Sequence, residues 1–277
     1  MIRSVLLPTG EAVPALGQGT WTMGERASER QAEIASLRLG IDLGLTLIDT
    51  AEMYAEGGAE EIVGEALHGL RDQVFLVSKV YPHNASPSGV VEACRRSLRR
   101  LRTDRLDLYL LHWRGAVPIE ETVAGFEELR RAGQIRHWGV SNFDTSDLRK
   151  LLALPEGRNC ATNQILYNVT RRGPEFDLLP WMAERTMPVM AYSPVEQGRL
   201  PRKGALSRIA AERDLSPFQI ALAWLLRRPN VLAIPKASNQ AHVRENRGAL
   251  DFELSDEELR LIDREFPPTR KRTLETL

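Results

Sequence analysis

The stretch Leu45–Tyr54, with the sequence LTLIDTAEMY, indicates both the fold and the chemistry of this chain. Its first four residues, LTLI, form a short and mostly apolar run that is typical of a buried strand. The run ends on a carboxylate, Asp49, and a phenol, Tyr54, follows in a turn-like segment. An acid at the end of a buried strand with a tyrosine just beyond it favours a site in which the tyrosine acts as an acid.

Two later apolar runs end in the same manner. Val74–Val77 leads into Ser78 and Lys79, and Leu106–Leu111 leads into His112. In a parallel sheet or barrel these ends lie on one face, so we expect the acid, the phenol, the lysine and the histidine to converge. Each residue alone has a structural interpretation, as a turn cap, a solvated side chain or rim packing. The shared position at strand ends favours a site.

The composition is that of a globular protein without a strong charge bias. The 277 residues are 43% hydrophobic, which is compatible with one large domain or two small ones. Lys+Arg and Asp+Glu number 37 each, so the formal net charge is zero and nothing indicates nucleic acid or an anionic membrane as a partner.

The cysteines and the N-terminus indicate a cytoplasmic protein. Cys94 and Cys160 have no metal-like spacing, so we expect two free thiols in a reducing compartment and no metal site. The start, MIRSVLLPTGEAVP, lacks the long apolar core of a signal peptide, and no run is long enough to span a membrane.

Strand and helix patterns alternate along the chain after a hairpin-like start, Ser4–Leu7 and Glu11–Pro14, which could plug the bottom of a barrel. The predicted strands are Ala15–Gly19, Thr46–Ile48, Val74–Ser78, Leu106–Leu111, Ile135–Val140, Ala161–Ile165, Pro188–Tyr192 and Val231–Ile234. The predicted helices are Ser28–Gly44, with Ser28 as cap and Gly44 as stop, Ala59–Leu70, Ser86–Leu101, Ile119–Ala132, Thr145–Ala153, Asp177–Arg185, Gly204–Arg213, Ser216–Arg228, Gln240–Arg247 and Ser255–Glu265.

About eight such alternations without a linker predict one α/β domain over residues 1–277, a closed (β/α)₈ TIM barrel with an N-terminal hairpin and extra helices near the C-terminus. A doubly wound sheet is the alternative, and it requires a glycine-rich turn after the first strand. Gly17-Gln18-Gly19 is suggestive, but the residues after it lack the fingerprint spacing.

The four converging side chains suit proton transfer to an oxygen. A nearby ammonium favours the phenolate and should lower the tyrosine pKa from its ordinary value of about 10. Asp49 would keep Lys79 charged, Tyr54 would donate the proton, and His112 would orient the carbonyl. The set contains no nucleophile and no metal site. It therefore suits a reaction whose other half comes from a cofactor, and hydride addition to a carbonyl is the natural candidate.

The chain resembles the aldo-keto reductase superfamily nearly from end to end. The motifs are PALGQGTW, GLTLIDTAEMY, SK after the third strand, DLYLLHW, GVSNF, NQILYN, AYSP, IPKAS and REN, in the order of the family. The resemblance implies a (β/α)₈ barrel that binds NADP(H) without a Rossmann domain, and a monomer. It also implies a catalytic tetrad, matched here by Asp49, Tyr54, Lys79 and His112.

The resemblance assigns cofactor contacts as well. Ser141, Asn142 and Gln164 would bind the nicotinamide carboxamide. Tyr192 would stack on the ring, the segment after it would follow the pyrophosphate, and Glu245 and Asn246 would reach the adenine. The full implied set is Thr20, Trp21, Asp49, Ser141, Asn142, Gln164, Tyr192, Ser193, Val195, Gln197, Gly198, Lys236, Ala237, Ser238, Asn239, His242, Glu245 and Asn246.

The 2′-phosphate contact departs from the better-known members. Lys236 matches the family lysine and favours NADP(H), but Ala237 and His242 stand where a hydroxyl and an arginine are usual. A histidine is only fractionally charged near neutral pH, so it binds a phosphate more weakly than a guanidinium does. Use of NAD(H) as well therefore stays open.

The substrate is expected to be a small carbonyl compound, because the chain looks closest to short bacterial members that reduce methylglyoxal, diketogluconate and assorted aldehydes. The expected substrate contacts are Trp21, Tyr54, Tyr81, His112 and Trp113. Two other readings stay open. One is a regulatory module that binds NADP(H) with little turnover, and the other is a Schiff-base aldolase that uses Lys79.

Overall fold

Eight parallel strands lie side by side in chain order within the computed structural model, which describes residues 3–268 and 274–276. The strands are β3 (Gln18–Gly19), β4 (Leu47–Asp49), β5 (Phe75–Val80), β6 (Leu106–Leu111), β7 (Ile135–Ser141), β8 (Cys160–Leu166), β9 (Val189–Tyr192) and β10 (Val231–Ala233). Each pairs in parallel with the next, as their apolar composition and buried faces require.

The first and last strands close the sheet into a barrel. The backbone N–H of Gly17 donates to the carbonyl of Ala233 at 2.8 Å, and that of Gly19 donates to the carbonyl of Pro235 at 3.0 Å. A Cβ at Gly19 would lie 2.7 Å from the carbonyl oxygen of Ile234, so only glycine permits this approach. The predicted closed barrel is confirmed, and the doubly wound alternative is wrong.

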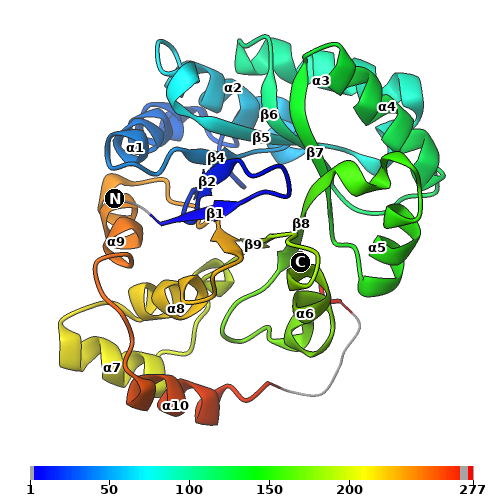
Figure 1. The fold of residues 1–277 in the computed structure, drawn as a ribbon. Helices are drawn as coiled ribbons and strands as arrows, with labels where there is room; N and C mark the ends of the chain where they lie inside the picture. The colour runs from blue at the N-terminus through cyan, green and yellow to red at the C-terminus, as the bar shows by residue number, and fades with distance from the viewer. Residues whose placement is uncertain (1–2, 269–273, 277) are drawn as a thin grey trace.

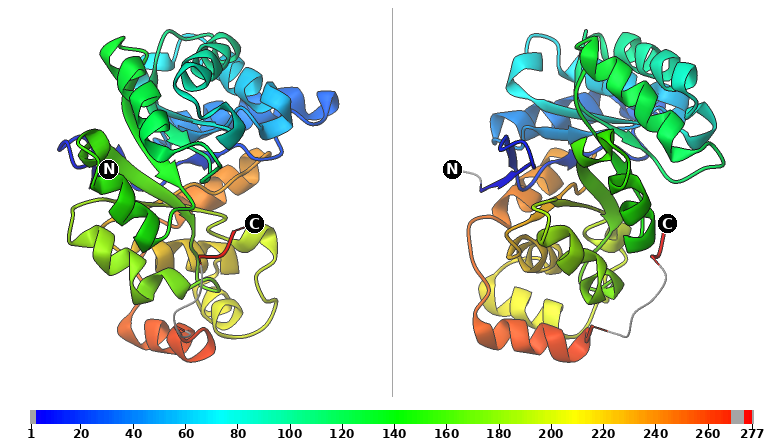
Figure 2. Two further views of the ribbon diagram at one scale, coloured as in Figure 1. Left: turned by 90° about the vertical axis from the view of Figure 1, so that its right-hand side faces the viewer. Right: turned by 45° about the vertical axis from the view of Figure 1, so that its right-hand side comes forward.

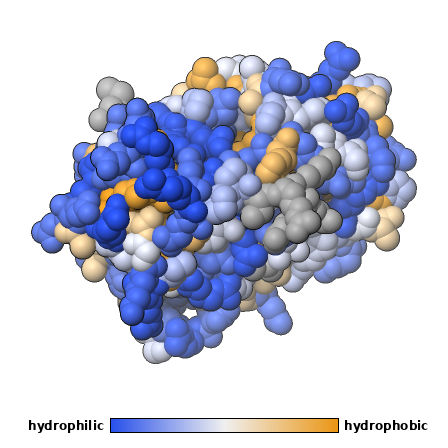
Figure 3. Space-filling model, turned by 90° about the horizontal axis from the view of Figure 1, so that it is seen from below, coloured by the Kyte–Doolittle hydropathy of each residue, from blue (hydrophilic) through white to orange (hydrophobic). Residues whose placement is uncertain are grey.

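Helices surround the barrel, as Figure 1 shows. They are α1 (Arg30–Asp42), α2 (Gly58–Ala66), α3 (Pro87–Leu101), α4 (Ile119–Arg131), α5 (Thr145–Leu152), α6 (Leu178–Ala183), α7 (Ala205–Arg213), α8 (Pro217–Leu226), α9 (Gln240–Gly248) and α10 (Asp256–Glu265). In both views of Figure 2, α7 and α10 lie together at the lower periphery. The surface seen from this side is mostly hydrophilic, with small apolar areas (Figure 3).

The predicted N-terminal hairpin is present as the antiparallel pair β1 (Ser4–Leu6) and β2 (Ala12–Pro14). Its inward side chains, Val5 and Val13, are buried and belong to the hydrophobic core. Figure 1 shows the hairpin in front of the middle of the ring of strands. It covers the end of the barrel at which the strands begin, which leaves the opposite end for the functional residues.

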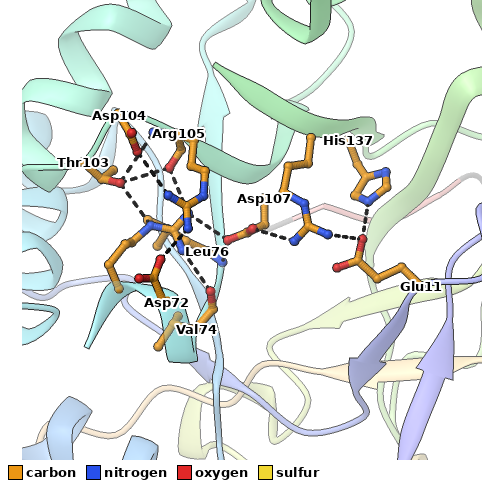
Figure 4. A network of polar contacts seen from close by, with 11 residues as sticks. Glu11, Asp72, Val74, Leu76, Thr103, Asp104, Arg105, Asp107 and His137 are labelled. Carbon is orange, nitrogen blue, oxygen red and sulfur yellow. Dashed lines mark hydrogen bonds and ion pairs between the residues drawn. The ribbon is translucent and has the colours of Figure 1, made fainter. Parts of the chain in front are cut away.

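A network of charged side chains ties this end of the barrel together (Figure 4). The carboxylate of Asp107, which is buried on β6, accepts hydrogen bonds from Arg71 at 2.8 Å, from Arg136 at 2.9 Å and from a backbone N–H of β5 at 2.8 Å. Arg136 also donates to Glu11 of the hairpin at 2.7 Å, and His137 lies 2.7 Å from the same carboxylate. The network therefore joins the hairpin to three strands.

Replacing Asp107 by Ala should lower the free energy of unfolding by about 3 kcal/mol, because Arg71 and Arg136 each lose their hydrogen bond to this buried carboxylate and a backbone N–H of β5 loses its acceptor. Chemical denaturation measures this change, and Asp104→Ala, at an aspartate whose side chain is 86% exposed, is the control. Equal stability of the two variants would contradict a structural role for the network.

Every predicted element is present, but the ends of several differ from the prediction: α2 ends at Ala66 and not at Leu70, and the first barrel strand begins at Gln18 and not at Ala15. β5 continues through Val80, so Ser78 and Lys79 lie inside the strand and not after it. Ser28 does not cap the first helix, since it lies in a short 3₁₀ turn and α1 begins only at Arg30 without a side-chain cap. Ser78 and Lys79 are polar, so the apolar pattern that marks β5 in the sequence stops before the strand itself ends.

Cys94 and Cys160 are free and buried, and burial raises the pKa of each thiol to about 12. The prediction of two free thiols is confirmed. Among the described residues, no helix is long and apolar enough to cross a membrane, and no group of three or more acidic, histidine or cysteine side chains could hold a metal ion.

Candidate active site

Lys79 is the centre of the site, and its side chain is fully buried. Its ammonium donates to Asp49 Oδ1 at 2.6 Å, to the carbonyl of Thr50 at 2.9 Å and to the hydroxyl of Tyr54 at 3.2 Å. An ammonium has three N–H groups, so these contacts use all of them. Burial lowers the pKa of Lys79, but the Asp49 carboxylate and the Tyr54 hydroxyl raise it by more, and the lysine stays charged.

The hydroxyl of Tyr54 can therefore give away its proton. Because an ammonium cannot accept a hydrogen bond, Tyr54 must accept from Lys79, and its own hydrogen points elsewhere. Burial raises the pKa of Tyr54 above its ordinary value, and the ammonium opposes this shift without cancelling it. The predicted net lowering of this pKa is wrong, because burial raises the pKa by more than the ammonium lowers it. A protonated tyrosine nevertheless suits the role of an acid.

His112 follows β6, and its ring lies edge-on to that of Tyr54, with 5.8 Å between the centroids. Burial, reinforced by the charge of Lys79, holds the pKa of His112 well below its ordinary range. The imidazole is therefore neutral near pH 7 and carries one N–H. Beside a tyrosine that donates a proton, a neutral imidazole can hydrogen-bond and orient a carbonyl oxygen.

The hydroxyl and the imidazole open into a cleft of about 990 Å³, within the size range of small-molecule and cofactor sites. The predicted residues that line it are Thr20, Trp21, Asp49, Tyr54, His112, Trp113, Ser141, Asn142, Gln164, Tyr192, Ser193, Val195, Gln197, Gly198, Lys236, His242, Glu245 and Asn246. Five other predicted residues do not line it: Lys79, Tyr81, Ala237, Ser238 and Asn239. Lys79 lies behind Tyr54, and Tyr81 packs its ring against Trp113 at 5.7 Å.

The ends of β7, β8 and β9 are tied together around the cleft. Asn142, which adopts a left-handed backbone with φ of 60°, donates to the carbonyl of His112 at 3.2 Å and accepts from the hydroxyl of Tyr192 at 3.0 Å. Gln164 donates its amide to Asp49 at 2.8 Å. The side-chain amides of Asn142 and Gln164 are therefore already held in fixed orientations. A bound carboxamide would replace some of their present hydrogen bonds. Their cofactor role stays a prediction.

The loop after β9 is held by hydrogen bonds from Asn168 and by an ion pair with Arg171. Asn168 donates to the carbonyl of Ser193 at 2.9 Å and to the carboxylate of Glu196 at 2.8 Å, and Arg171 pairs with the same carboxylate at 2.7 Å. Burial opposes the ionisation of Glu196, but these bonds outweigh it and lower its pKa. Ser193, Glu196 and Gln197 all have positive φ, so the network stabilises a strained loop along the cleft.

Lys236 lies at the other end of the cleft with an exposed side chain. Within the described residues it forms no ion pair, although partial burial lowers its pKa against the field of Glu33, Glu29 and Glu25. The hydroxyl of Ser238, two residues on, is buried without a hydrogen-bond partner among the described residues. An exposed cation in the cleft suits an anionic group.

A family model described as the aldo/keto reductase family matches residues 15–265. The chain is 55% identical to the methylglyoxal reductase YeaE of Escherichia coli K12 over 267 residues, which is 95% of this chain and 94% of that protein. The chain belongs to the aldo/keto reductase family.

Solved structures of other aldo/keto reductases share the fold. That of Klebsiella pneumoniae, in complex with NADP and acetate, has a TM-score of 0.97 and 53% identity, with 100% of both chains covered. The thermostable aldo-keto reductase Tm1743, in complex with the inhibitor epalrestat, has a TM-score of 0.89 and 39% identity over 95% of this chain and 99% of that one. The predicted family, barrel and oxidoreductase class are confirmed.

Several features of this aldo/keto reductase site were missed by sequence reasoning. The cleft is also lined by Gly19, Thr22, Met53, Arg114, Phe218, Ile234 and Thr276, and by Pro194, which lies in the segment expected to follow the pyrophosphate. Met53 and Arg114 sit beside predicted site residues, so adjacency was a usable signal. Phe218 on α8 and Thr276 near the C-terminus come from distant parts of the chain, and nothing in their sequence context marks them.

We expect kcat/KM for carbonyl reduction to be constant from about pH 6 to about pH 9. Activity falls as the pH drops through the lowered pKa of His112 or rises through the raised pKa of Tyr54, and both lie outside this range. A pH–rate profile measures this, with tryptophan fluorescence to confirm that the fold persists. An inflection near pH 6.5 would contradict the assigned state of His112.

Proposed function

We propose that this chain reduces small aldehydes and ketones to alcohols with NADPH, and that methylglyoxal is among its substrates. The observation that carries the proposal is the hydroxyl of Tyr54, which accepts from the buried ammonium of Lys79 and so keeps its own proton for a substrate. The family match, the similarity to a methylglyoxal reductase and the solved relative with NADP support carbonyl reduction with this cofactor.

The protein residues divide the work of the reaction. NADPH, when bound, supplies the hydride. His112 orients the substrate by a hydrogen bond to its carbonyl oxygen, and Tyr54 delivers a proton to that oxygen as negative charge develops there. Lys79, held charged by Asp49, stabilises the phenolate that remains after the transfer. Trp21 and Trp113, both exposed at the cleft, contact the rest of the substrate.

The volume of the cleft suits a dinucleotide, and so does the order of the polar side chains along the cleft. Amide and hydroxyl groups, Ser141, Asn142 and Gln164, lie near Tyr54, where a carboxamide would bind. At Gly198, with φ of 79°, no atom lies within 4 Å of the point that a Cβ would occupy, so the loop leaves room for a phosphate chain. Lys236, whose exposed side chain lines the cleft, would hold the 2′-phosphate.

Of the two other readings, the structure disfavours the aldolase. Lys79 is charged and fully buried, and all its donors are used, whereas a Schiff-base lysine must be neutral and reach the substrate. The regulatory module would keep the cleft and bind NADPH without turnover. Initial rates of NADPH oxidation with methylglyoxal separate it from the enzyme. The cytoplasmic location and the monomeric state stay predictions.

Replacing Tyr54 by Phe should lower kcat for methylglyoxal reduction by about 10²- to 10⁴-fold, because the ring remains and only the donated proton is lost. Binding of NADPH, followed by fluorescence titration, should be unchanged. Tyr167→Phe, which removes a buried hydroxyl bonded to Glu175 away from the cleft, is the matched control and should keep its rate. A Tyr54→Phe enzyme with near-normal turnover would rule out the assigned acid.

Replacing Lys236 by Met should raise KM for NADPH by about 10- to 100-fold, the loss expected for a charge-assisted contact, and should change KM for NADH little. Lys203→Met, at an exposed lysine outside the cleft, is the control. Equal loss with both cofactors would mean that Lys236 does not contact the 2′-phosphate. Because Ala237 and His242 stand where a hydroxyl and an arginine are usual, we also expect measurable activity of the wild type with NADH.

A further inference from the structure

Glu52 lies between Asp49 and Tyr54 in the chain, and its side chain is only 8% exposed and bonds to the backbone of Tyr81 and to the side chains of Asn84 and Arg96. Its Oε1 accepts a hydrogen bond from the backbone N–H of Tyr81 at 2.8 Å and another from the side-chain amide of Asn84 at 3.0 Å. A single carboxylate oxygen thus joins the segment that carries the acid to the segment that follows β5.

The other oxygen of Glu52 contributes a weaker contact. Oε2 lies 3.5 Å from the guanidinium of Arg96 on α3, and the side chain of that arginine is 38% exposed. An exposed ion pair at this distance contributes little to stability. The two hydrogen bonds of Oε1 are therefore the ones that hold the Tyr81–Asn84 segment in place.

Tyr81 in turn supports two residues of the cleft. Its ring lies edge-on to Trp113 with 5.7 Å between the centroids, and it lies 6.5 Å from the ring of His112. The rings of His112 and Trp113 are themselves 5.0 Å apart. Tyr81 does not line the cleft, so it acts behind the two rings that the substrate meets.

We propose that Glu52 is a positioning residue, which holds Tyr81 and through it sets the placement of His112 and Trp113 against the carbonyl substrate. The inference rests on the proposed reductase function. It predicts an effect on the binding of the carbonyl compound and none on that of NADPH, since none of the contacts of Glu52 reaches the cofactor end of the cleft. If Glu52 had only a structural role, its replacement would change the stability of the protein and leave the KM for the carbonyl substrate unchanged.

The first test compares Glu52→Ala, Glu52→Gln and Arg96→Ala in the full chain. Glu52→Ala leaves the Tyr81 N–H without an acceptor and should raise KM for methylglyoxal about tenfold, with KM for NADPH unchanged. Glu52→Gln keeps an acceptor oxygen and should restore KM to near the wild-type value, and it also covers the case in which the alanine variant fails to fold. Arg96→Ala removes only the ion pair and should leave both KM values unchanged.

The second test is a double-mutant cycle between Glu52→Ala and Tyr81→Ala. If Glu52 acts through Tyr81, the loss in kcat/KM for the double variant should match that for Tyr81→Ala alone. Two results would overturn the proposal: the full effect of Glu52→Ala persisting without Tyr81, or a lower melting temperature with unchanged KM. Absence of turnover in the wild type would instead refute the reductase function itself, which separates the two failures.

Discussion

The ion pair between Lys79 and Asp49 is the constraint on which the rest of the site depends. Both groups are almost completely removed from water, and a buried pair of this kind contributes little net stability, because desolvation cancels most of the attraction. Its presence inside the barrel is explained by what it does for Tyr54. A lysine with every donor satisfied holds a fixed charge beside a hydroxyl, and that hydroxyl is left with one free proton.

The barrel supplies this geometry through its strand register. Asp49 pairs with Val77 and Lys79 with Leu110, so both charged side chains leave rigid backbone near the ends of neighbouring strands. The loops beyond are less regular, and several of their residues have positive φ, Asn142 among them. Side-chain bonds between separate loops hold these conformations, as Asn168 and Arg171 do for the loop after β9. Rigid strands place Asp49 and Lys79, and tied loops shape the cleft.

The sequence predicted the strands and the convergence of Asp49, Tyr54, Lys79 and His112 well, because apolar runs that end in ionisable residues leave a local pattern. Features that depend on three-dimensional packing leave no such local pattern in the sequence. The direction of the Tyr54 pKa shift depends on how completely the barrel excludes water, and the sequence shows only that a lysine is near. Asn168 lies in a recognised motif, but its partner Glu196 is 28 residues away and only the fold brings them together. Phe218 reaches the cleft from a helix with no marking pattern.

The hairpin and the Asp107 network lie at one end of the barrel, and the cleft lies at the other. Substitutions at distant sites without shared partners usually have additive effects on stability. The barrel therefore separates the part that stabilises the fold from the part that forms the cleft. Changes at the mouth, such as at Trp113 or Arg114, can accumulate while the far end preserves the scaffold. This division makes the protein readily evolvable towards new carbonyl compounds, by selection or by directed mutagenesis.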